Sequence, residues 1–196
     1  MTALDTKQQI YAIGASGTGK TYIAAVHAAN MYLRRKINKI IISRPNIPVG
    51  KDLGFLPGDM REKYEPWAAP VLDVLSEQLG AGVVETALKN GNIELAPLSY
   101  MRGRSFNNAM IIVDEAQNLT VHELKMLLTR IGENTQIVIA GDIKQTDLKN
   151  TSGLGTVIQL VKKYALDVPV IEFTSADCVR SGICKMWIEI FDKENL

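Results

Sequence analysis

The segment Gly14–Thr21, GASGTGKT, constrains the fold of this 196-residue chain more than any other stretch. It fits the pattern G-x-x-x-x-G-K-[ST], in which glycines let the backbone turn sharply and direct successive N–H groups inward. The apolar run Gln9–Ile13 before it is typical of a buried strand, and the alanine-rich segment Lys20–Arg35 after it is typical of a helix. The sequence therefore predicts a strand, a phosphate-binding loop and a helix in succession.

Each part of this loop has an expected task. The inward N–H groups and the positive N-terminal end of the following helix attract phosphate oxygens. Lys20 is expected to reach the β- and γ-phosphates of a nucleotide, and the Thr21 hydroxyl to ligate Mg²⁺. The residues expected to bind the nucleotide are Gly14, Ala15, Ser16, Gly17, Thr18, Gly19, Lys20 and Thr21.

Further apolar runs alternate with amphipathic segments, which indicates an α/β fold with a mostly parallel sheet and helices on both faces. The additional strands are predicted at residues 39–43, 92–98, 109–115, 136–142 and 170–173. Apolar spacing predicts helices around residues 72–79, 154–161 and 183–190, and a Thr120/Glu123 capping box opens another whose apolar stripe runs to Ile131. Because no second-domain boundary is visible, we expect one domain over residues 1–196.

Two glycine-containing loops interrupt this rhythm. The segment Arg44–Asp59 has three prolines and three glycines, and its apolar residues Leu53, Phe55 and Leu56 favour an ordered loop. Loops of this length in compact domains are usually functional or disordered. The second predicted loop is Tyr100–Phe106.

Asp114 and Glu115 follow the most apolar strand of the chain, AMIIV. Such a strand delivers a carboxylate to the carboxyl edge of the sheet, beside the phosphate loop. Asp114 is expected to hold Mg²⁺, through water, and Glu115 to take a proton from an attacking water. Because nucleotide kinases and switch GTPases of this fold generally lack the second carboxylate, Glu115 favours hydrolysis over phosphate transfer.

The third motif, Gly141-Asp142-Ile143-Lys144-Gln145, again follows a buried strand. An amide at this position can hydrogen-bond the γ-phosphate or the attacking water, and so report whether ATP or ADP is bound. Gln145 is the candidate for this role, although a turn rich in Gly and Asp is common by itself.

A phosphoryl-transfer transition state also needs a cation. Arg180, between the last strand and the last helix, is the candidate within its own subunit, whereas Arg102 and Arg104 are candidates to reach a neighbour's site. Arg44 is a further candidate, and each of these arginines is equally compatible with a structural role.

Composition bears on several other functions. The net charge of +1 argues neither for nor against a nucleic-acid partner, although a dedicated duplex binder usually carries a basic excess, and the spacing of Cys178 and Cys184 matches no zinc or redox motif. The polar first residues and the lack of a long apolar run predict a soluble, cytoplasmic protein with no membrane segment. His27 is expected on a packed helix face and His122 on the surface, and Trp67 is expected in packing rather than in base stacking.

Three longer segments carry a resemblance to a known family. SRPNIPVGKDLGFLPGD, APLSYMRGRSFNNAMIIVDEAQN and GDIKQTDL, together with the phosphate loop, resemble signatures of the PhoH family. The resemblance, over about residues 9–185, implies a RecA-like P-loop NTPase fold similar to the core of superfamily 1 helicases. It also implies ATP binding, often with ATPase activity; some members carry a ribonuclease domain linked to RNA unwinding, and compact forms like this one are frequent in bacteriophages.

The chain departs from the family pattern at both ends. Members usually have a glutamine-bearing segment before the phosphate loop that contacts adenine, and Gln8 or Gln9 is the available substitute. The C-terminal motif that usually reads DVVRHPLV reads DCVRSGIC here, which retains the matching Arg180 and lacks the histidine-proline pair.

We therefore expect a Mg²⁺-dependent ATPase with Glu115, Lys20, Gln145 and Arg180 as its catalytic residues and Thr21 and Asp114 as its metal ligands. Its helicase kinship favours RNA or single-stranded DNA as the substrate to be remodelled. A lone core needs a neighbour to complete its site, so a homo-oligomeric ring, such as a hexamer, is expected. The alternative is a nucleotide-dependent switch or scaffold with little turnover, and a small-molecule kinase ranks third.

Overall fold

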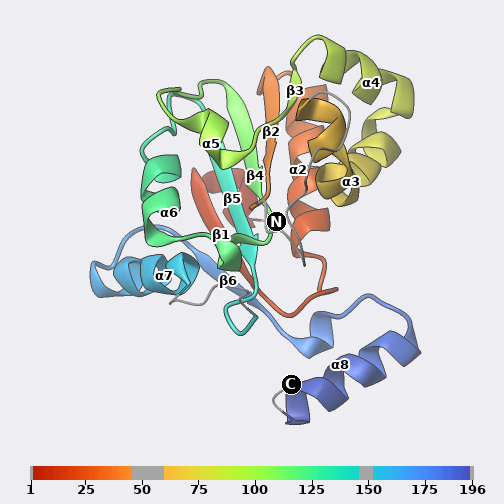
Figure 1. Ribbon diagram of the computed structural model, residues 1–196, viewed down its shortest axis with the longest axis vertical. Coiled ribbons are helices and arrows are strands. Elements are labelled where there is room, and N and C mark those ends of the chain that lie inside the picture. Colours follow the sequence, from red (N-terminus) through yellow and green to blue (C-terminus); the bar gives the residue numbers. More distant parts are fainter. Residues whose placement is uncertain (1, 46–59, 146–151, 195–196) are drawn as a thin grey trace.

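The computed structural model contains a six-stranded, all-parallel sheet with the strand order β3-β2-β4-β5-β1-β6 (Figure 1). The structure describes residues 2–45, 60–145 and 152–194. The strands are β1 (Gln9–Gly14), β2 (Lys39–Ser43), β3 (Ile93–Leu95), β4 (Ala109–Val113), β5 (Gln136–Gly141) and β6 (Val170–Phe173). The predicted α/β fold with a parallel sheet is confirmed.

Helices cover both faces of this sheet, as Figure 1 shows. One layer contains α2 (Lys20–Leu33), α3 (Met60–Leu79) and α4 (Ala81–Lys89). The other contains α5 (Leu98–Met101), α6 (Val121–Leu128) and α7 (Gly153–Lys163). The remaining elements are α1 (Thr2–Thr6), the short 3₁₀ helices η1 (Ala116–Asn118) and η2 (Ser175–Asp177), and α8 (Gly182–Glu194).

The four inner strands β1, β2, β4 and β5 read as nearly continuous apolar runs because both of their faces are buried, whereas the edge strands β3 and β6 are partly exposed. In β4, Met110 and Ile112 pack in the core beneath α2–α4, whereas Ile111 and Val113 pack in the core beneath α5–α7. All four side chains are fully buried. The same alternation holds in β2, where Ile41 faces the opposite core from its two isoleucine neighbours.

The topology gathers three sequence motifs at one edge of the sheet. Because the strands are parallel, the segments that follow β1, β5 and β4 all leave from the same edge. β5 lies between β1 and β4, so the phosphate loop, the Asp142 turn and the Asp114–Glu115 pair stand side by side. The fold therefore places the predicted chemistry in a single region.

The helix boundaries differ from the sequence prediction at several points. α2 ends at Leu33 rather than Arg35, because Arg35 takes a left-handed backbone with φ 53° that leaves the helix. The helix expected around residues 72–79 begins earlier, at Met60, and is followed by a further helix, α4, after Gly80, whose φ is 90°. The Thr120/Glu123 capping box is confirmed, since the Thr120 hydroxyl accepts from the Glu123 N–H and the Glu123 carboxylate accepts from the Thr120 N–H.

Two segments were predicted wrongly, in part. The strand expected at residues 92–98 covers only Ile93–Leu95, because Pro97 starts the short helix α5. That helix takes up the beginning of the expected loop Tyr100–Phe106, and only its remainder forms the turn around Gly103, whose φ is 78°. Of the loop predicted at Arg44–Asp59, residues 46–59 lie outside the described part of the chain.

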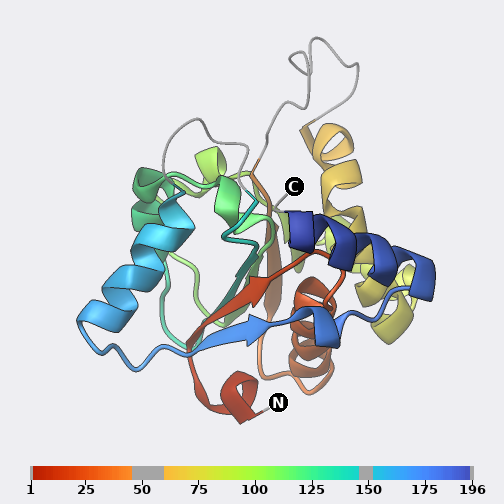
Figure 2. The ribbon, with the colours of Figure 1, turned by 90° about the horizontal axis from the view of Figure 1, so that it is seen from below.

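The last helix differs from the others in its packing. α8 lies below the sheet in Figure 1 and nearest the viewer in Figure 2, rather than in either covering layer. Its predicted apolar stripe, formed by Ile183, Met186, Trp187 and Ile190, is between 38% and 62% exposed. This stripe therefore contributes to neither of the two cores found among the described residues.

Candidate functional site

The phosphate loop connects β1 to α2 as predicted. Gly17 and Gly19 have φ values of 79° and 85°, a backbone conformation that glycine adopts without steric cost. Gly19 is the N-cap of α2, so no capping side chain covers the first N–H groups of the helix. Together with the positive end of the helix dipole, these N–H groups form a site suited to an anion.

Lys20 is folded into this loop. Its Nζ atom donates to the backbone oxygens of Gly14 and Ala15, at 2.6 Å each. Burial lowers the pKa of Lys20, and the nearby carboxylates of Asp142, Asp114 and Glu115 oppose that shift. The ammonium group therefore lies at the centre of the anion site, held by backbone carbonyls that a phosphate group can replace.

Thr21 and Asp114 come together from opposite sides of the site. The Thr21 hydroxyl donates a 2.7 Å hydrogen bond to Oδ1 of Asp114, which is buried at the end of β4. A hydroxyl and a carboxylate form an all-oxygen donor pair, which suits Mg²⁺, an ion that takes one or two protein ligands and completes its shell with phosphate and water. The described residues contain no cluster of three or more His, Cys, Asp or Glu side chains for a metal held by protein alone. The donor set thus fits Mg²⁺ bound together with a nucleotide.

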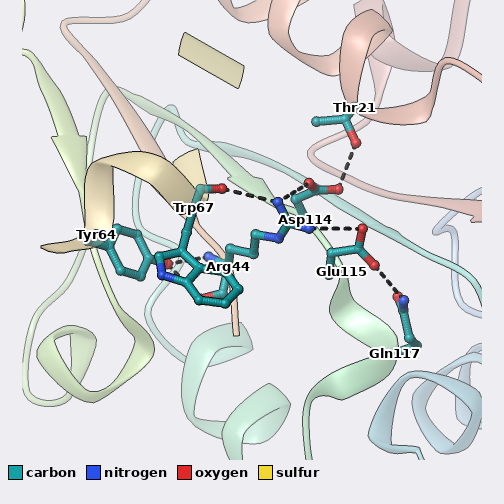
Figure 3. Close-up of polar contacts among 7 residues, drawn as sticks. All are labelled: Thr21, Arg44, Tyr64, Trp67, Asp114, Glu115 and Gln117. Carbon is teal, nitrogen blue, oxygen red and sulfur yellow. Dashed lines mark hydrogen bonds and ion pairs between the residues drawn. The ribbon is translucent and has the colours of Figure 1, made fainter. Parts of the chain in front are cut away.

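Glu115 follows in an uncommon backbone conformation. Its φ of 53° and ψ of 38° are left-handed, which is costly for a residue with a side chain and recurs at functional sites. Its two carboxylate oxygens are held separately: Oε1 accepts from Arg44 at 3.2 Å, and Oε2 accepts from the Gln117 amide at 2.6 Å (Figure 3). The candidate base is therefore fixed from both sides.

Gln117 is a site residue that the sequence motifs do not identify by themselves. Its Oε1 atom accepts the backbone N–H of Asp142 at 3.0 Å, and its backbone oxygen accepts the Ser152 hydroxyl at 2.8 Å. One side chain thus bridges Glu115, after β4, and the turn that follows β5. The available signal was its place two residues after Glu115 in the segment VDEAQN, but the sequence does not show which groups it bridges.

Gln145 lines a pocket that Lys20 and Glu115 also line. Its backbone N–H donates to the Asp142 oxygen at 3.2 Å, and the residue is exposed. The turn is closed by the Asp142 carboxylate, which accepts the Lys144 N–H at 3.0 Å. The structure therefore brings Gln145 to the pocket, whereas its expected contact with a γ-phosphate stays a prediction.

The four candidate arginines have different surroundings. Arg180 lies against the phosphate loop of its own chain: a Cβ atom at Gly17 would come within 2.6 Å of its Nε. Arg44 lines the pocket from the end of β2 and contacts Glu115. Arg104 forms a two-pronged ion pair with Glu94 and stacks over the Phe106 ring at 4.8 Å. Arg102 is exposed in the turn after α5, away from the pocket as the described residues line it.

These residues surround one pocket of about 540 Å³ at the carboxyl edge of the sheet. Its lining includes five residues of the phosphate loop, both carboxylates of the Asp114–Glu115 pair, and Gln145, Arg44 and Arg180. Pro70 and Val74 of α3 add an apolar wall. Gly14 and Ala15 line an adjoining pocket between the ends of β1 and β6.

Other sequence candidates lie elsewhere. Gln8 donates to the Gly132 oxygen and Gln9 to the Tyr11 hydroxyl, at the end of β1 opposite the phosphate loop. Neither residue lines the pocket described above, and the suggested contact with adenine stays a prediction. His27 is buried on α2 and pairs with Gln136 at 2.9 Å, and His122 is exposed, both as predicted. Trp67 is half-buried in α3.

This protein has a P-loop NTPase fold, as shown by its parallel sheet, the glycine loop that opens α2 and the paired carboxylates after β4. The chain belongs to the PhoH family: the family model described as PhoH-like protein matches residues 1–192. It is 42% identical over 195 residues to Protein PhoH of Escherichia coli K12, and the aligned region covers 97% of this chain and 55% of that protein. It is 41% identical over 198 residues to the PhoH-like protein of Bacillus subtilis 168, and the aligned region covers 100% of this chain and 61% of that protein.

A third relative is similar to this chain over almost the same length. The chain is 40% identical over 192 residues to the PhoH-like protein of Synechocystis, which covers 97% of this chain and 58% of that protein. The chain thus spans between about half and three fifths of the length of these curated relatives. Within the described residues, no helix combines the length and the apolar character that crossing a membrane requires.

Proposed function

We propose that the protein is a Mg²⁺-dependent ATP hydrolase. The observation that carries the proposal is the placement of Glu115 in the same pocket as Lys20 and the Thr21–Asp114 pair. A phosphate grip alone serves binding, transfer or hydrolysis, but a second carboxylate next to the metal ligand supplies a general base for water. This combination favours hydrolysis.

Each residue has a defined task in this reaction. Lys20 exchanges the Gly14 and Ala15 oxygens for phosphate oxygens, while the N–H groups at the start of α2 bind the same anion. Thr21 and Asp114 would hold Mg²⁺, which would neutralise negative charge on the phosphates of the nucleotide. Glu115 orients the attacking water and accepts its proton.

Gln145 and Arg180 complete the proposed machinery. Gln145, at the rim of the pocket, hydrogen-bonds the γ-phosphate or the water and so couples nucleotide state to the turn after β5. Arg180, beside Gly17, supplies positive charge to the transition state from within the same chain. Arg44 ranks behind it because its guanidinium is paired with Glu115, and Arg104 because it is paired with Glu94. Arg102 lies outside the pocket lining given by the described residues, so it is a candidate only for a neighbour's site.

Phosphate release from ATP tests this proposal. Glu115→Gln should lower turnover by about 10²- to 10⁴-fold, the usual contribution of a general base, while nucleotide binding is retained. Lys20→Ala serves as the contrasting variant, since it should weaken binding itself. Full turnover by Glu115→Gln would remove Glu115 as the base, and binding without turnover in the wild type would favour the nucleotide-dependent switch.

We further propose that hydrolysis drives remodelling of RNA or single-stranded DNA. The order of the motifs, which is similar to that in the core of superfamily 1 helicases, supports this proposal. The net charge of +1 provides no independent argument for it. Poly-U RNA should stimulate phosphate release. Turnover that is unchanged by poly-U and by oligo-dT would overturn the nucleic-acid proposal while leaving the ATPase in place.

Assembly into a homo-oligomeric ring, such as a hexamer, is part of this proposal. The exposed apolar stripe on α8 supports it, because apolar spacing of this kind on a helix usually serves packing against another surface. In a ring, a neighbouring subunit would place further side chains against the pocket. Light scattering with ATP and Mg²⁺ should show the oligomer, and a monomer under these conditions would contradict it.

A further inference from the structure

Arg44 connects the carboxylates of the site to helix α3. One guanidinium nitrogen, Nη2, donates to Oε1 of Glu115 at 3.2 Å. The other, Nη1, donates to the backbone oxygen of Trp67 at 3.2 Å and lies 4.0 Å from Oδ2 of Asp114. Figure 3 shows this side chain between Trp67 on one side and the two carboxylates on the other.

The backbone of Arg44 is fixed to the same helix. The Tyr64 hydroxyl accepts the Arg44 N–H at 2.5 Å and donates to the Arg44 backbone oxygen at 2.6 Å. Tyr64 is buried, with an exposed fraction of 4%, so this pair of hydrogen bonds is sheltered from water. Main chain and side chain of Arg44 are thus both attached to α3.

The other end of the link consists of groups that a bound nucleotide would compete for. Glu115 would turn toward the attacking water, and Asp114 would turn toward the metal ion. The Arg44–Glu115 pair can yield to this competition, because a partly exposed ion pair contributes little stability. The wall of the pocket formed by Pro70 and Val74 belongs to α3 and lies within two turns of Trp67.

We propose that Arg44 is a positioning residue: it holds Glu115 while the two side chains are paired, and it transmits nucleotide binding to α3 when a bound nucleotide competes for that carboxylate. The proposal rests on the ATP-binding function proposed above. When nucleotide draws Glu115 away, the guanidinium loses its carboxylate partner and re-forms its contacts, and the surroundings of Trp67 change.

The geometry of the contact requires arginine. The planar guanidinium presents separate donors to the Trp67 oxygen and to Glu115, which lie in different directions. A lysine ammonium is a single compact charge on a flexible stem, so it can satisfy one of these partners while losing the other. Arg44→Lys therefore keeps the charge and breaks the link.

Intrinsic fluorescence tests the link without relying on turnover. The chain has two tryptophans, so a Trp187→Phe background reports on Trp67 alone. Addition of AMP-PNP with Mg²⁺ should change the Trp67 emission, and Arg44→Lys should remove at least half of that change. Competition with a fluorescent ATP analogue gives the affinity of each variant, so that the Trp67 responses are compared at saturating AMP-PNP.

Two further variants make the result specific. Arg34→Lys, at an exposed arginine beyond the far end of α2, should leave the Trp67 response unchanged. Glu115→Ala removes the other end of the link without altering Arg44, so it should reduce the response as well; this variant also serves if Arg44→Lys lowers the melting temperature.

The outcomes separate this inference from the proposed function. A full Trp67 response in Arg44→Lys and Glu115→Ala, or no response in a wild-type protein that binds the fluorescent analogue, would overturn the link. An Arg44-dependent response without phosphate release would support the link and contradict the proposed hydrolysis.

Discussion

The Thr21 hydroxyl donates a 2.7 Å hydrogen bond to Oδ1 of Asp114, and this contact ties the first turn of α2 to the end of β4. It places two oxygen atoms beside the phosphate loop, on the two residues proposed to hold Mg²⁺. The pair therefore preorganises the proposed Mg²⁺ site, since neither side chain has to be brought from elsewhere in the fold.

The first prediction concerns this pair. Thr21→Ala removes the hydroxyl, and the Mg²⁺ concentration needed for half-maximal phosphate release should rise about 10- to 100-fold, the usual cost of losing a group that binds or orients at a metal site. Thr21→Ser keeps the hydroxyl and should stay near the wild-type value. Equal Mg²⁺ dependence in Thr21→Ala and the wild type would show that the hydroxyl does not serve the ion.

The sequence predicts the parts of this site better than it predicts their connections. The phosphate loop and the strand before Asp114 are recognisable because glycine spacing and continuous apolar runs have direct structural causes. The contacts of Glu115 with Arg44 and Gln117 are different, because they depend on how the ends of neighbouring strands pack. No local pattern encodes which of four arginines meets that carboxylate.

Tertiary packing also accounts for the positions at which the secondary structure was predicted wrongly. The short helix α5 and the short strand β3 have too few residues for a periodic signal, so the apolar run around Pro97 reads as one strand. The left-handed residue Arg35 ends α2 although its residue type favours continuing the helix. Tertiary packing decides these positions rather than intrinsic preference.

The second prediction separates backbone strain from close packing in two glycines. Gly14 has φ 141° and lies at the junction of β1 and β6, where a Cβ atom would come 2.1 Å from the Phe173 backbone oxygen. Gly91 also has a positive φ, 72°, but a Cβ there meets nothing within 4 Å. Gly91→Ala should cost about 1 kcal/mol of unfolding free energy from strain alone.

Gly14→Ala should cost at least ~2 kcal/mol more than Gly91→Ala, because a backbone oxygen cannot move aside as a flexible side chain can. Urea unfolding of the two variants measures the difference. Equal losses would mean that β6 shifts to accommodate the added methyl group.

The third prediction concerns pH and His27, which is buried on α2 and pairs with Gln136. Burial lowers the pKa of His27 below its ordinary value of 6.5, although the Gln136 hydrogen bond opposes the shift. The unfolded chain therefore binds a proton at this residue more readily than the folded chain. It follows that the free energy of unfolding should fall as the pH drops below 6.5, until the folded-state pKa is reached.

Urea unfolding at about pH 7.5 and about pH 5.5 checks this sign, because the window brackets the ordinary pKa of histidine. His27→Gln should flatten the dependence, whereas His122→Gln, at the other and exposed histidine, should leave it intact. A dependence that vanished with His122→Gln instead would contradict the assignment.

The fourth prediction distinguishes two arginines of the same chain. Arg104 bonds Glu94 with both prongs, and these hydrogen bonds are the main reason why the pKa of Glu94 is lowered, with Lys39 adding to the effect at 3.2 Å. Arg104→Ala should therefore cost about 1 kcal/mol of unfolding free energy, a value that takes account of its partial exposure, and should leave phosphate release unchanged.

Arg180→Ala should show the reverse. Its side chain lies along Gly17 of the phosphate loop and is otherwise exposed, so its removal should cost little stability. If it supplies the transition-state charge, phosphate release should fall by about 10³-fold or more, while Arg180→Lys recovers only part of the rate because ammonium lacks the planar fork. Loss of turnover in Arg104→Ala with normal turnover in Arg180→Ala would assign the transition-state charge to Arg104 instead of Arg180. A neighbouring subunit would then have to deliver Arg104 to the site.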